Sequence, residues 1–219
     1  MKVVFIVPAD SVRRTWLYRI GSRFYGHSNV ITGPLILAKI LHNAGHQAEV
    51  YEELDEDIDF SCCRDADVVC IYTITSNAPR AYEIADRERK QGRRVLIGGF
   101  HASSLPEEAA RHADQVIVGE GEGVILDVIE GKITDRIVRA PLVCDLDSIP
   151  FPDYSLLKTP CEAANVMTTR GCPFCCSFCT TSRMFHPYRE RSVESVISEL
   201  RYYKKLGFKY MNFEDANFT

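Results

Sequence analysis

Four of the nine cysteines lie within one short segment of the sequence, RGCPFCCSFC. Cysteines this close together do not build a disulfide framework, because a bridge needs separated backbones with suitable Cβ geometry. The CxxxCxxC spacing of Cys172, Cys176 and Cys179 favours thiolate ligation of a 4Fe-4S cluster instead. Three protein ligands leave one iron open to an exogenous molecule, so the spacing indicates catalysis rather than simple electron storage.

Cys175 makes a vicinal pair with Cys176 and leaves two other interpretations open. All four cysteines could close around a zinc ion, although structural zinc sites usually take two ligand pairs separated by a longer insert. Cys172 with Cys175, or Cys176 with Cys179, could form a thioredoxin-like redox pair, although such pairs open a helix in a different fold. The spacing favours the iron-sulfur cluster over both alternatives.

The segment TTRGCPFCCSFC resembles the signature loop of the radical S-adenosylmethionine enzymes. The resemblance implies that Cys172, Cys176 and Cys179 hold a 4Fe-4S cluster whose open iron binds S-adenosylmethionine. It also implies that one electron cleaves S-adenosylmethionine to a 5′-deoxyadenosyl radical, and that Phe178 lies near the adenine.

The later segment NFEDANFT is similar to the second-strand segment of the same family, which usually carries two adjacent acidic residues. Asp215 matches the first acid, Ala216 replaces the second, and Glu214 is a candidate substitute. The resemblance therefore implies that Asp215 contacts S-adenosylmethionine.

Glycine-containing and hydroxyl-bearing loops follow the strands expected in the first two-thirds of the chain. In doubly wound sheets, ligands bind outside the carboxyl ends of the strands, where the strand order reverses. Glycine lets the backbone approach a bulky ligand closely, and free amides and hydroxyls can bond its polar edge. The candidate cofactor-binding residues in these loops are Thr73, Thr75, Ser76, Gly98, Gly99, Gly119 and Glu120. No strand-linked GxGxxG occurs, so a dinucleotide site is not expected.

The GG before His101, the PEE after it and the later GEGE resemble the cobalamin-binding domain that precedes many radical S-adenosylmethionine barrels. The resemblance implies that cobalamin binds at this sheet. No Asp-x-His-x-x-Gly occurs, so it further implies cobalamin with no imidazole on cobalt. We expect His101 to donate a hydrogen bond in its loop rather than to ligate a metal.

The elements that must position these loops alternate in a steady rhythm of strand and helix. Near-continuous apolar runs predict parallel strands covered on both faces at 2–7, 47–51, 67–72, 94–98 and 115–118. Amphipathic stretches predict helices at 34–43, 79–91 and 106–112. Residues 1–140 are therefore expected to form an α/β domain, a Rossmann-like (flavodoxin-like) doubly wound parallel sheet.

Prolines punctuate residues 141–163, which we expect to be a linker. A strand at 164–169, a helix at 192–206 and a strand at 208–213 then predict the opening of a second, parallel-stranded domain in residues 164–219, which we expect to be incomplete. The family resemblance identifies this part as the first βα units of a radical S-adenosylmethionine partial TIM barrel.

The helix at 192–206 carries three expectations of its own. Ser192 is its predicted N-cap, and Arg189 and Arg191 just before it are expected to be solvated. Its apolar stripe is expected to face the core and comprises Val193, Val196, Ile197, Leu200 and Tyr203.

Composition limits the function classes. The 219 residues are 46% hydrophobic and 26% charged, as in ordinary globular proteins. Their 26 basic and 30 acidic residues give a net charge of −4, and no basic run with aromatics beside it occurs, so nucleic acid is not an expected partner. The N-terminal apolar run ends at Pro8, too early for a signal peptide or membrane span, so we expect a cytoplasmic protein with no transmembrane segment.

The leading hypothesis is a cobalamin-dependent radical S-adenosylmethionine enzyme, or its N-terminal fragment, that uses a 4Fe-4S cluster, S-adenosylmethionine and cobalamin. The resemblance implies methyl transfer or ring formation on an unreactive carbon of a small-molecule, tetrapyrrole-like or lipid-like substrate. It also implies an electron donor such as flavodoxin or ferredoxin. The alternative is a non-catalytic corrinoid-binding module with a closed four-cysteine zinc site.

Overall fold

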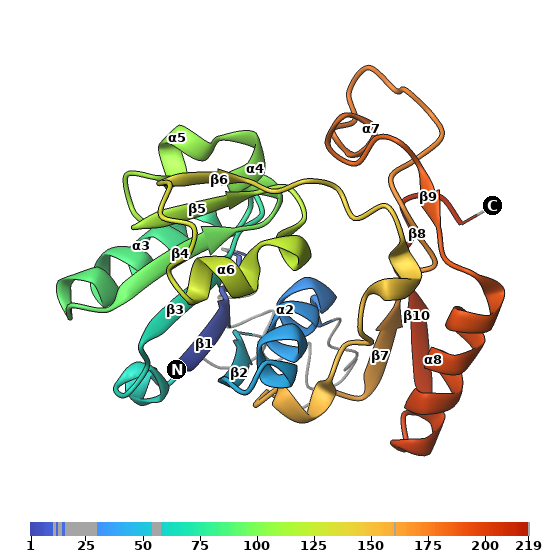
Figure 1. Ribbon diagram of the computed structural model, residues 1–219, viewed down its shortest axis with the longest axis horizontal. Coiled ribbons are helices and arrows are strands. Elements are labelled where there is room, and N and C mark those ends of the chain that lie inside the picture. The colour runs from blue at the N-terminus through green and yellow to red at the C-terminus, as the bar shows by residue number, and fades with distance from the viewer. Residues whose placement is uncertain (11, 13–14, 16–29, 54–57, 160, 219) are drawn as a thin grey trace. The chain divides into compact units, whose positions relative to one another are not determined.

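The structure is a computed structural model that describes the chain apart from residues 11, 13–14, 16–29, 54–57, 160 and 219 (Figure 1). The chain divides into two compact units. The first contains Met1–Gly26, Ile31–Pro141 and Pro152–Pro160, and the second contains His27–Val30, Leu142–Phe151 and Cys161–Thr219. Most of the segment expected to be a linker is therefore shared between the two units, with 142–151 in the second and 152–160 in the first.

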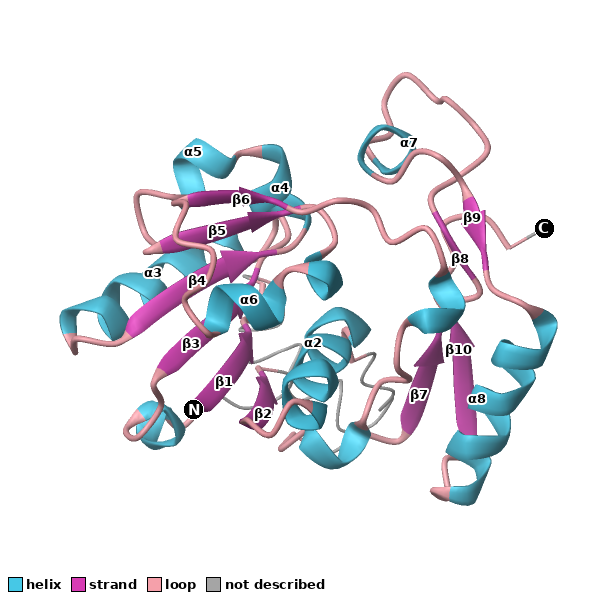
Figure 2. Cartoon of the chain, in the orientation of Figure 1, coloured by secondary structure: helices cyan, strands magenta, loops and turns pink. Residues whose placement is uncertain are grey.

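Six parallel strands form the sheet of the first unit (Figure 2). They are β1 (Lys2–Val7), β2 (Gln47–Glu52), β3 (Val68–Tyr72), β4 (Arg94–Gly98), β5 (Gln115–Val118) and β6 (Ile137–Arg139). Their order is β2-β1-β3-β4-β5-β6, so the direction of winding reverses between β1 and β3. This confirms the doubly wound α/β fold, and β6 is a further strand that the sequence did not indicate.

Helices cover both faces of this sheet. They are α2 (Thr32–Asn43), α3 (Ala78–Lys90), α4 (Phe100–Ser104), α5 (Pro106–Ala109) and α6 (Ile125–Ile129). In Figure 1, α2 and α6 lie in front of the sheet and α3 lies behind it. Alternate strand residues such as Ile6, Ile71 and Ile97 are buried in one cluster with Ala81 and Ile84 of α3. Removal of this apolar surface from water is the main stabilising contribution. The one-turn helices α4 and α6 were not predicted.

A short segment of the proline-containing region runs beside β2, which is one of the two edge strands of the sheet. Leu157 forms a parallel bridge with Val50, and the amide of Lys158 donates to the carbonyl of Val50 at 2.8 Å. The Thr159 hydroxyl accepts from the amide of Glu52 at 3.0 Å and donates to its carbonyl at 2.9 Å. These bonds cover part of an edge whose backbone groups would otherwise be unpaired.

The second unit contains two small two-stranded sheets. β7 (Ala163–Val166) pairs in parallel with β10 (Tyr210–Phe213), and α8 (Val193–Lys205) precedes β10 in the chain. β8 (Thr169–Arg170) pairs antiparallel with β9 (Arg189–Glu190), and α7 (Thr181–Met184) lies between them in sequence. The predicted strand–helix–strand order is confirmed, but the strand predicted at 164–169 is divided into β7 and β8.

The helix α8 begins as predicted but buries a different face. The Ser192 hydroxyl caps it by accepting from the amide of Ser195 at 3.1 Å. Tyr203 and Glu199 are the side chains it buries, whereas Val193 is 72% exposed and Ile197 is 39% exposed. The expected core stripe is therefore wrong at Val193 and Ile197, and the face that α8 buries carries Glu199, which is paired with Arg191.

The two arginines before α8 also differ from expectation. Arg189 is buried, with its Nη1 donating to the carbonyl of Val143 at 2.5 Å, and the side chain of Arg191 is 11% exposed. Carbonyl and carboxylate acceptors replace the water that their guanidinium groups lose on burial. Within the described ranges, no helix is long and apolar enough to cross a membrane.

Candidate functional site

The loops after β3 and β4 are bonded together at the carboxyl edge of the six-stranded sheet. The amide and the hydroxyl of Thr73 both donate to the carbonyl of Gly98, each at 2.8 Å, and the hydroxyl accepts from the amide of Ala102 at 3.1 Å. Thr73 is fully buried. The structure thus brings the predicted residues Thr73, Gly98 and Gly99 together, and it occupies the Thr73 hydroxyl with contacts inside the protein.

The packing of the two loops requires glycine at position 99. Its φ is 101°, and a Cβ at this position would lie 2.5 Å from the carbonyl oxygen of Thr73. A side chain here would therefore combine left-handed backbone strain with a collision against main-chain atoms. The sequence placed this glycine correctly at a strand end, and the structure shows that it accommodates the neighbouring loop.

Two polar residues that sequence reasoning did not single out tie the remaining loops to this edge. The buried Asn77 donates to the carbonyl of Pro8, after β1, at 2.9 Å and accepts from the amide of Ile74 at 2.8 Å. The Ser103 hydroxyl accepts from the amide of Gly119, after β5, at 3.0 Å. The loops after β1 and β3, where the strand order reverses, are thus joined, and so are α4 and the loop after β5. The predicted residue Glu120 is buried beside Gly119.

His101 lies beneath the exposed part of the β3 loop. Its Nδ1 is 3.3 Å from the Thr75 hydroxyl and its Nε2 is 3.4 Å from Glu108 Oε1. The hydrogen bond with His101 is the largest cause that lowers the pKa of Glu108. Both imidazole nitrogens are engaged within the protein, whereas Thr75 and Ser76 are exposed at the edge.

The exposed groups at this edge fit a ligand that carries amides. The exposed groups are the hydroxyls of Thr75 and Ser76, on loops held by the contacts above. Hydroxyls both donate and accept, so they can bond either end of an amide. The residues present therefore suit a corrinoid at the carboxyl edge.

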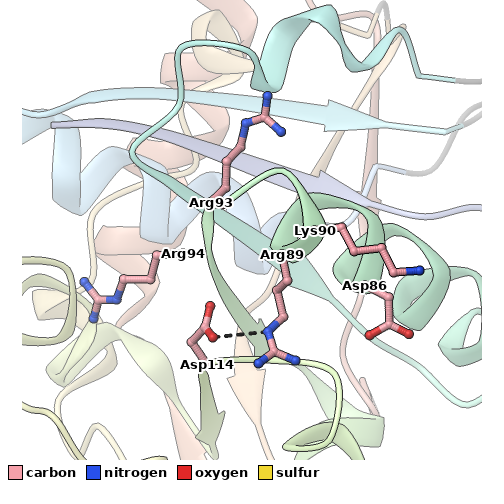
Figure 3. Close-up of a pocket in the computed structure, with 7 residues that line it drawn as sticks. Asp86, Arg89, Lys90, Arg93, Arg94 and Asp114 are labelled. Atoms are coloured by element: carbon pink, nitrogen blue, oxygen red, sulfur yellow. Dashed lines mark hydrogen bonds and ion pairs between the residues drawn. The ribbon is translucent and has the colours of Figure 1, made fainter.

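A pocket of about 550 Å³ lies at the opposite edge of the same sheet (Figure 3). It is lined by Asp86, Arg89, Lys90, Gly92, Arg93, Arg94 and Asp114, where α3 ends and β4 and β5 begin. Several of its charges are already paired: Arg89 Nε lies 3.1 Å from Asp114, and Arg93 Nη1 lies 2.7 Å from the buried Glu88. This pocket is at the amino ends of the strands, away from the edge where such sheets bind ligands.

The cysteine loop of the second unit follows β8, and the pairing of β8 with β9 closes its base. Gly171, directly before Cys172, has a φ of 89°, and a Cβ there would lie 2.5 Å from the carbonyl oxygen of Phe185. The loop therefore requires glycine to start its turn.

None of the four clustered cysteines is in a disulfide. Cys172 and Cys179 are half-buried, Cys175 and Cys176 are exposed, and Phe178 is 88% exposed. In the part of the chain that the structure describes, no three histidine, cysteine, aspartate or glutamate side chains are gathered to hold a metal ion. Free thiols on one loop are nevertheless the ligand type that iron-sulfur clusters take, so the donor chemistry fits such a cluster.

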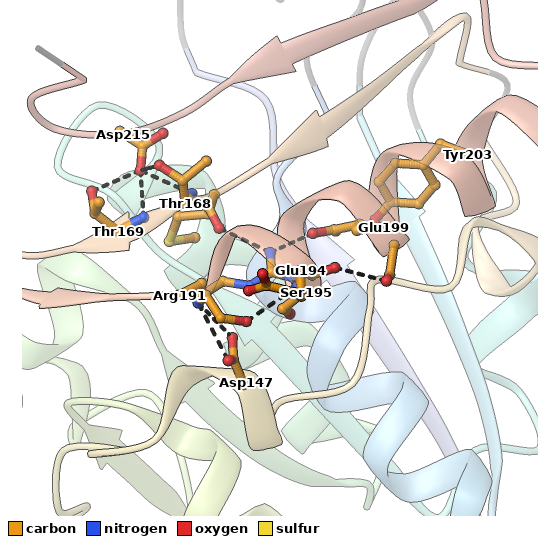
Figure 4. A network of polar contacts seen from close by, with 12 residues as sticks. Asp147, Thr168, Thr169, Arg191, Glu194, Ser195, Glu199, Tyr203 and Asp215 are labelled. Carbon is orange, nitrogen blue, oxygen red and sulfur yellow. Dashed lines mark hydrogen bonds and ion pairs between the residues drawn. The ribbon is translucent and has the colours of Figure 1, made fainter.

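Asp215 joins the end of β10 to the segment between β7 and β8 (Figure 4). Its Oδ1 accepts from the amide and hydroxyl of Thr168, at 2.9 and 3.0 Å, and from those of Thr169, at 2.5 and 2.7 Å. Its Oδ2 is buried and has no hydrogen-bond partner among the described residues. The neighbouring Glu214 accepts from Asn165 at 2.8 Å. The residue predicted to contact S-adenosylmethionine therefore also shapes the backbone that leads into the cysteine loop.

A buried ion pair that the sequence did not reveal supports the same region (Figure 4). The Arg191 guanidinium donates to Glu199, to the carbonyl of Met167 at 3.0 Å and to the Ser195 hydroxyl at 2.9 Å. Glu199 also accepts from the Tyr203 hydroxyl at 2.7 Å. The only signal in the sequence is that Glu199 and Tyr203 are four residues apart and share a helix face.

Most of the first unit matches a known protein family. The B12 binding domain family matches residues 32–129, from the start of α2 to the end of α6. The chain contains a B12-binding domain. The seven predicted residues from Thr73 to Glu120 lie within this B12-binding domain, whereas the cysteine loop lies outside it.

Sequence relatives extend the comparison beyond the B12-binding domain. The chain is 36% identical to bacteriochlorophyllide d C-12(1)-methyltransferase of Chlorobaculum tepidum over 67% of its own length and 35% of that protein. It is 32% identical to an uncharacterized methyltransferase of Pyrococcus horikoshii over its full length and 54% of that protein. The chain thus spans about a third to a half of the length of these relatives.

One solved structure has a similar fold across both units. The radical S-adenosylmethionine methyltransferase TsrM of Kitasatospora setae, solved with cobalamin and a [4Fe-4S] cluster bound, superposes with a TM-score of 0.66 at 15% identity, covering 99% of this chain and 48% of TsrM. Its complex with tryptophan and a S-adenosylmethionine analogue gives a TM-score of 0.67. The family match confirms the expected cobalamin-binding domain, and the chain shares the fold of this radical S-adenosylmethionine methyltransferase.

Proposed function

We propose that the protein is a cobalamin-dependent radical S-adenosylmethionine methyltransferase. The observation that carries this proposal is the presence, in one chain, of a B12-binding domain at 32–129 and a free-thiol CxxxCxxC loop directly after β8. Relatives at 31 to 36% identity are named as methyltransferases, whereas a cyclase relative is 26% identical, which favours methyl transfer over ring formation.

Each set of residues has its own part in this proposal. The thiolates of Cys172, Cys176 and Cys179 would hold the 4Fe-4S cluster, and Phe178 and Asp215 would lie beside S-adenosylmethionine. The loops after β3, β4 and β5 would hold cobalamin. The side chains of Thr75 and Ser76 would contact it, and Thr73 would position the loops. Backbone groups at Gly98, Gly99, Gly119 and Glu120 would also line the ligand. When bound, the cluster supplies the electron that splits S-adenosylmethionine, and cobalamin supplies a methyl group.

Substrate, electron donor and location complete the proposal. A tetrapyrrole-like substrate is supported by the bacteriochlorophyllide methyltransferase relatives. Cluster reduction requires a one-electron donor, for which we propose a flavodoxin or ferredoxin. Free thiols across the described chain suit a reducing compartment, so we propose a cytoplasmic location.

The test is anaerobic reconstitution of the full chain with iron and sulfide, followed by electron paramagnetic resonance of the reduced protein with and without S-adenosylmethionine. We expect a 4Fe-4S signal that shifts when S-adenosylmethionine is added, because an open iron changes its ligands. A signal that does not respond to S-adenosylmethionine contradicts the proposal. One tightly bound zinc per chain, with no cluster, supports the non-catalytic corrinoid-binding module instead.

A further inference from the structure

Thr75, His101 and Glu108 form a line of polar contacts that leads from the exposed β3 loop to the start of α5. We propose that Glu108 fixes the tautomer of His101, and that His101 thereby holds the Thr75 hydroxyl as a hydrogen-bond acceptor toward the amide N–H groups of a corrinoid. The inference rests on the proposed binding of cobalamin and assigns positioning roles to His101 and Glu108.

The first step is the contact between Glu108 and His101. An ionised carboxylate can only accept hydrogen bonds, and the hydrogen bond with His101 lowers the pKa of Glu108, so the ionised form is favoured. With this carboxylate 3.4 Å from Nε2, the contact is a hydrogen bond only if Nε2 carries a proton, so we assign a proton to Nε2. The His101 side chain is 7% exposed, so water does not compete freely for this position.

The second step is the contact between His101 and Thr75. A neutral imidazole with its proton on Nε2 has only a lone pair on Nδ1. When the imidazole is neutral, the Thr75 hydroxyl, 3.3 Å from Nδ1, donates its single proton inward. The oxygen then presents lone pairs alone on its exposed side.

The third step is the chemistry of the ligand. Corrinoids carry primary amides around the ring, and each amide has two N–H donors as well as a carbonyl acceptor. A hydroxyl held as an acceptor selects the N–H end of such an amide, because a carbonyl would meet lone pairs instead of a proton. Thr75 thus fixes the orientation of an amide arm, whereas no imidazole among the described residues holds the neighbouring Ser76 hydroxyl, which can rotate.

The experiment uses the full chain with four single variants. Nitrogen-15 NMR of His101 reports its tautomer in the ligand-free chain, and titration with hydroxocobalamin, followed by absorbance, reports affinity. Glu108→Gln replaces an acceptor-only carboxylate with an amide that can either donate to Nε2 or accept from it, so the Nε2–H tautomer is no longer enforced and we expect the Nδ1–H tautomer to become populated. Glu107→Gln is the matched control, because Glu107 is exposed on the same short helix and loses the same charge.

We expect the Nε2–H tautomer alone in the unmodified chain and in Glu107→Gln, and a populated Nδ1–H tautomer in Glu108→Gln. The affinity for hydroxocobalamin should fall about three- to tenfold in Glu108→Gln, the range of one neutral hydrogen bond. Thr75→Val should show a similar loss and Thr75→Ser should bind as the unmodified chain does. Glu108→Gln should add little to Thr75→Val, because both changes remove the same contact.

An Nδ1–H tautomer in the unmodified chain, or equal affinity in Glu108→Gln and Glu107→Gln, would overturn the inference. Additive losses in the double variant would also overturn it. Absence of hydroxocobalamin binding in the unmodified chain would overturn the proposed function and the ligand role of Thr75 together. The tautomer measurement distinguishes that failure from a failure of the Glu108–His101 contact itself.

Discussion

The carbonyl oxygen of Thr73 lies 2.5 Å from the point where a Cβ at Gly99 would stand. The two residues follow neighbouring parallel strands, and the amide of His101 donates to the same carbonyl at 3.1 Å. The close approach lets the β3 loop and the first turn of α4 share one set of main-chain bonds. The carboxyl edge of the B12-binding domain therefore has a fixed backbone.

Gly99→Ala should destabilise the chain by at least about 2 kcal/mol, because the new Cβ adds left-handed strain to a main-chain collision. Chemical denaturation followed by circular dichroism measures this change. Gly123→Ala is the control, since no atom lies within 4 Å of its Cβ position, and its effect should stay within about 0.5 kcal/mol. Equal effects of the two substitutions would contradict this account of Gly99.

Single replacement of Cys172, Cys176 or Cys179 by alanine should abolish the 4Fe-4S cluster after reconstitution, because each removes one of three thiolate ligands. Cys175→Ala should retain it, although Cys175 lies on the same loop and is exposed. Iron and acid-labile sulfide content, with the electron paramagnetic resonance signal, measure the outcome. Loss of iron in Cys175→Ala equal to that in the other variants would refute this ligand assignment.

Glu199→Gln should destabilise the second unit by about 3 kcal/mol, because it leaves the Arg191 guanidinium without its buried counter-charge. Glu194→Gln on the exposed side of the same helix should cost about 0.5 kcal/mol through the lost interaction with the helix N-terminus. Thermal denaturation of both variants tests the difference. If the two midpoints fall equally, the buried pair does not stabilise this unit.

Burial raises the pKa of the Cys70 thiol from 9.0 to about 12. In the unfolded chain the thiol ionises near its ordinary value, so the unfolded state loses its proton first and the stability falls as the pH rises from 9 toward 12. Between about pH 8 and about pH 10 this one group should lower the free energy of unfolding by about 1.4 kcal/mol. Cys70→Ala, which cannot ionise, should lose less stability over that interval.

The comparison for this prediction is the change with pH, not the absolute stability, because Cys70→Ala also leaves a small cavity in the core. Urea denaturation of both chains at the two pH values separates these effects. Parallel stability curves for the two chains would show that Cys70 does not contribute to the alkaline loss.

Periodicity and apolar runs predicted the parts of the fold whose burial is continuous. β1, β4 and β5 have the predicted bounds, because strands covered on both faces carry near-continuous apolar runs. β6 has only three residues, of which Val138 is buried, so it carries no run that periodicity could detect. Its place in the sheet depends on pairing with β5.

The candidate site was predictable where it follows from sheet topology and not where it depends on tertiary partners. The positions of Thr73, Gly98 and Gly119 follow from the rule that loops at carboxyl strand ends gather at one edge. Asn77 and Ser103 act through bonds to loops distant in sequence, and nothing local marks them. From the sequence, Glu199 is expected to be exposed on α8, because its burial depends on pairing with Arg191.

The bonds of Lys158 and Thr159 to β2 bear on where the chain can be cut. A truncation after Pro141 would keep all six strands of the first sheet but expose the backbone groups of Val50 and Glu52 that those residues cover. Uncovered strand edges pair with other molecules, so such a fragment should self-associate. A fragment that extends through residue 160 keeps this cover and should not self-associate through β2, so the useful boundary of the first unit lies well after β6, its last strand.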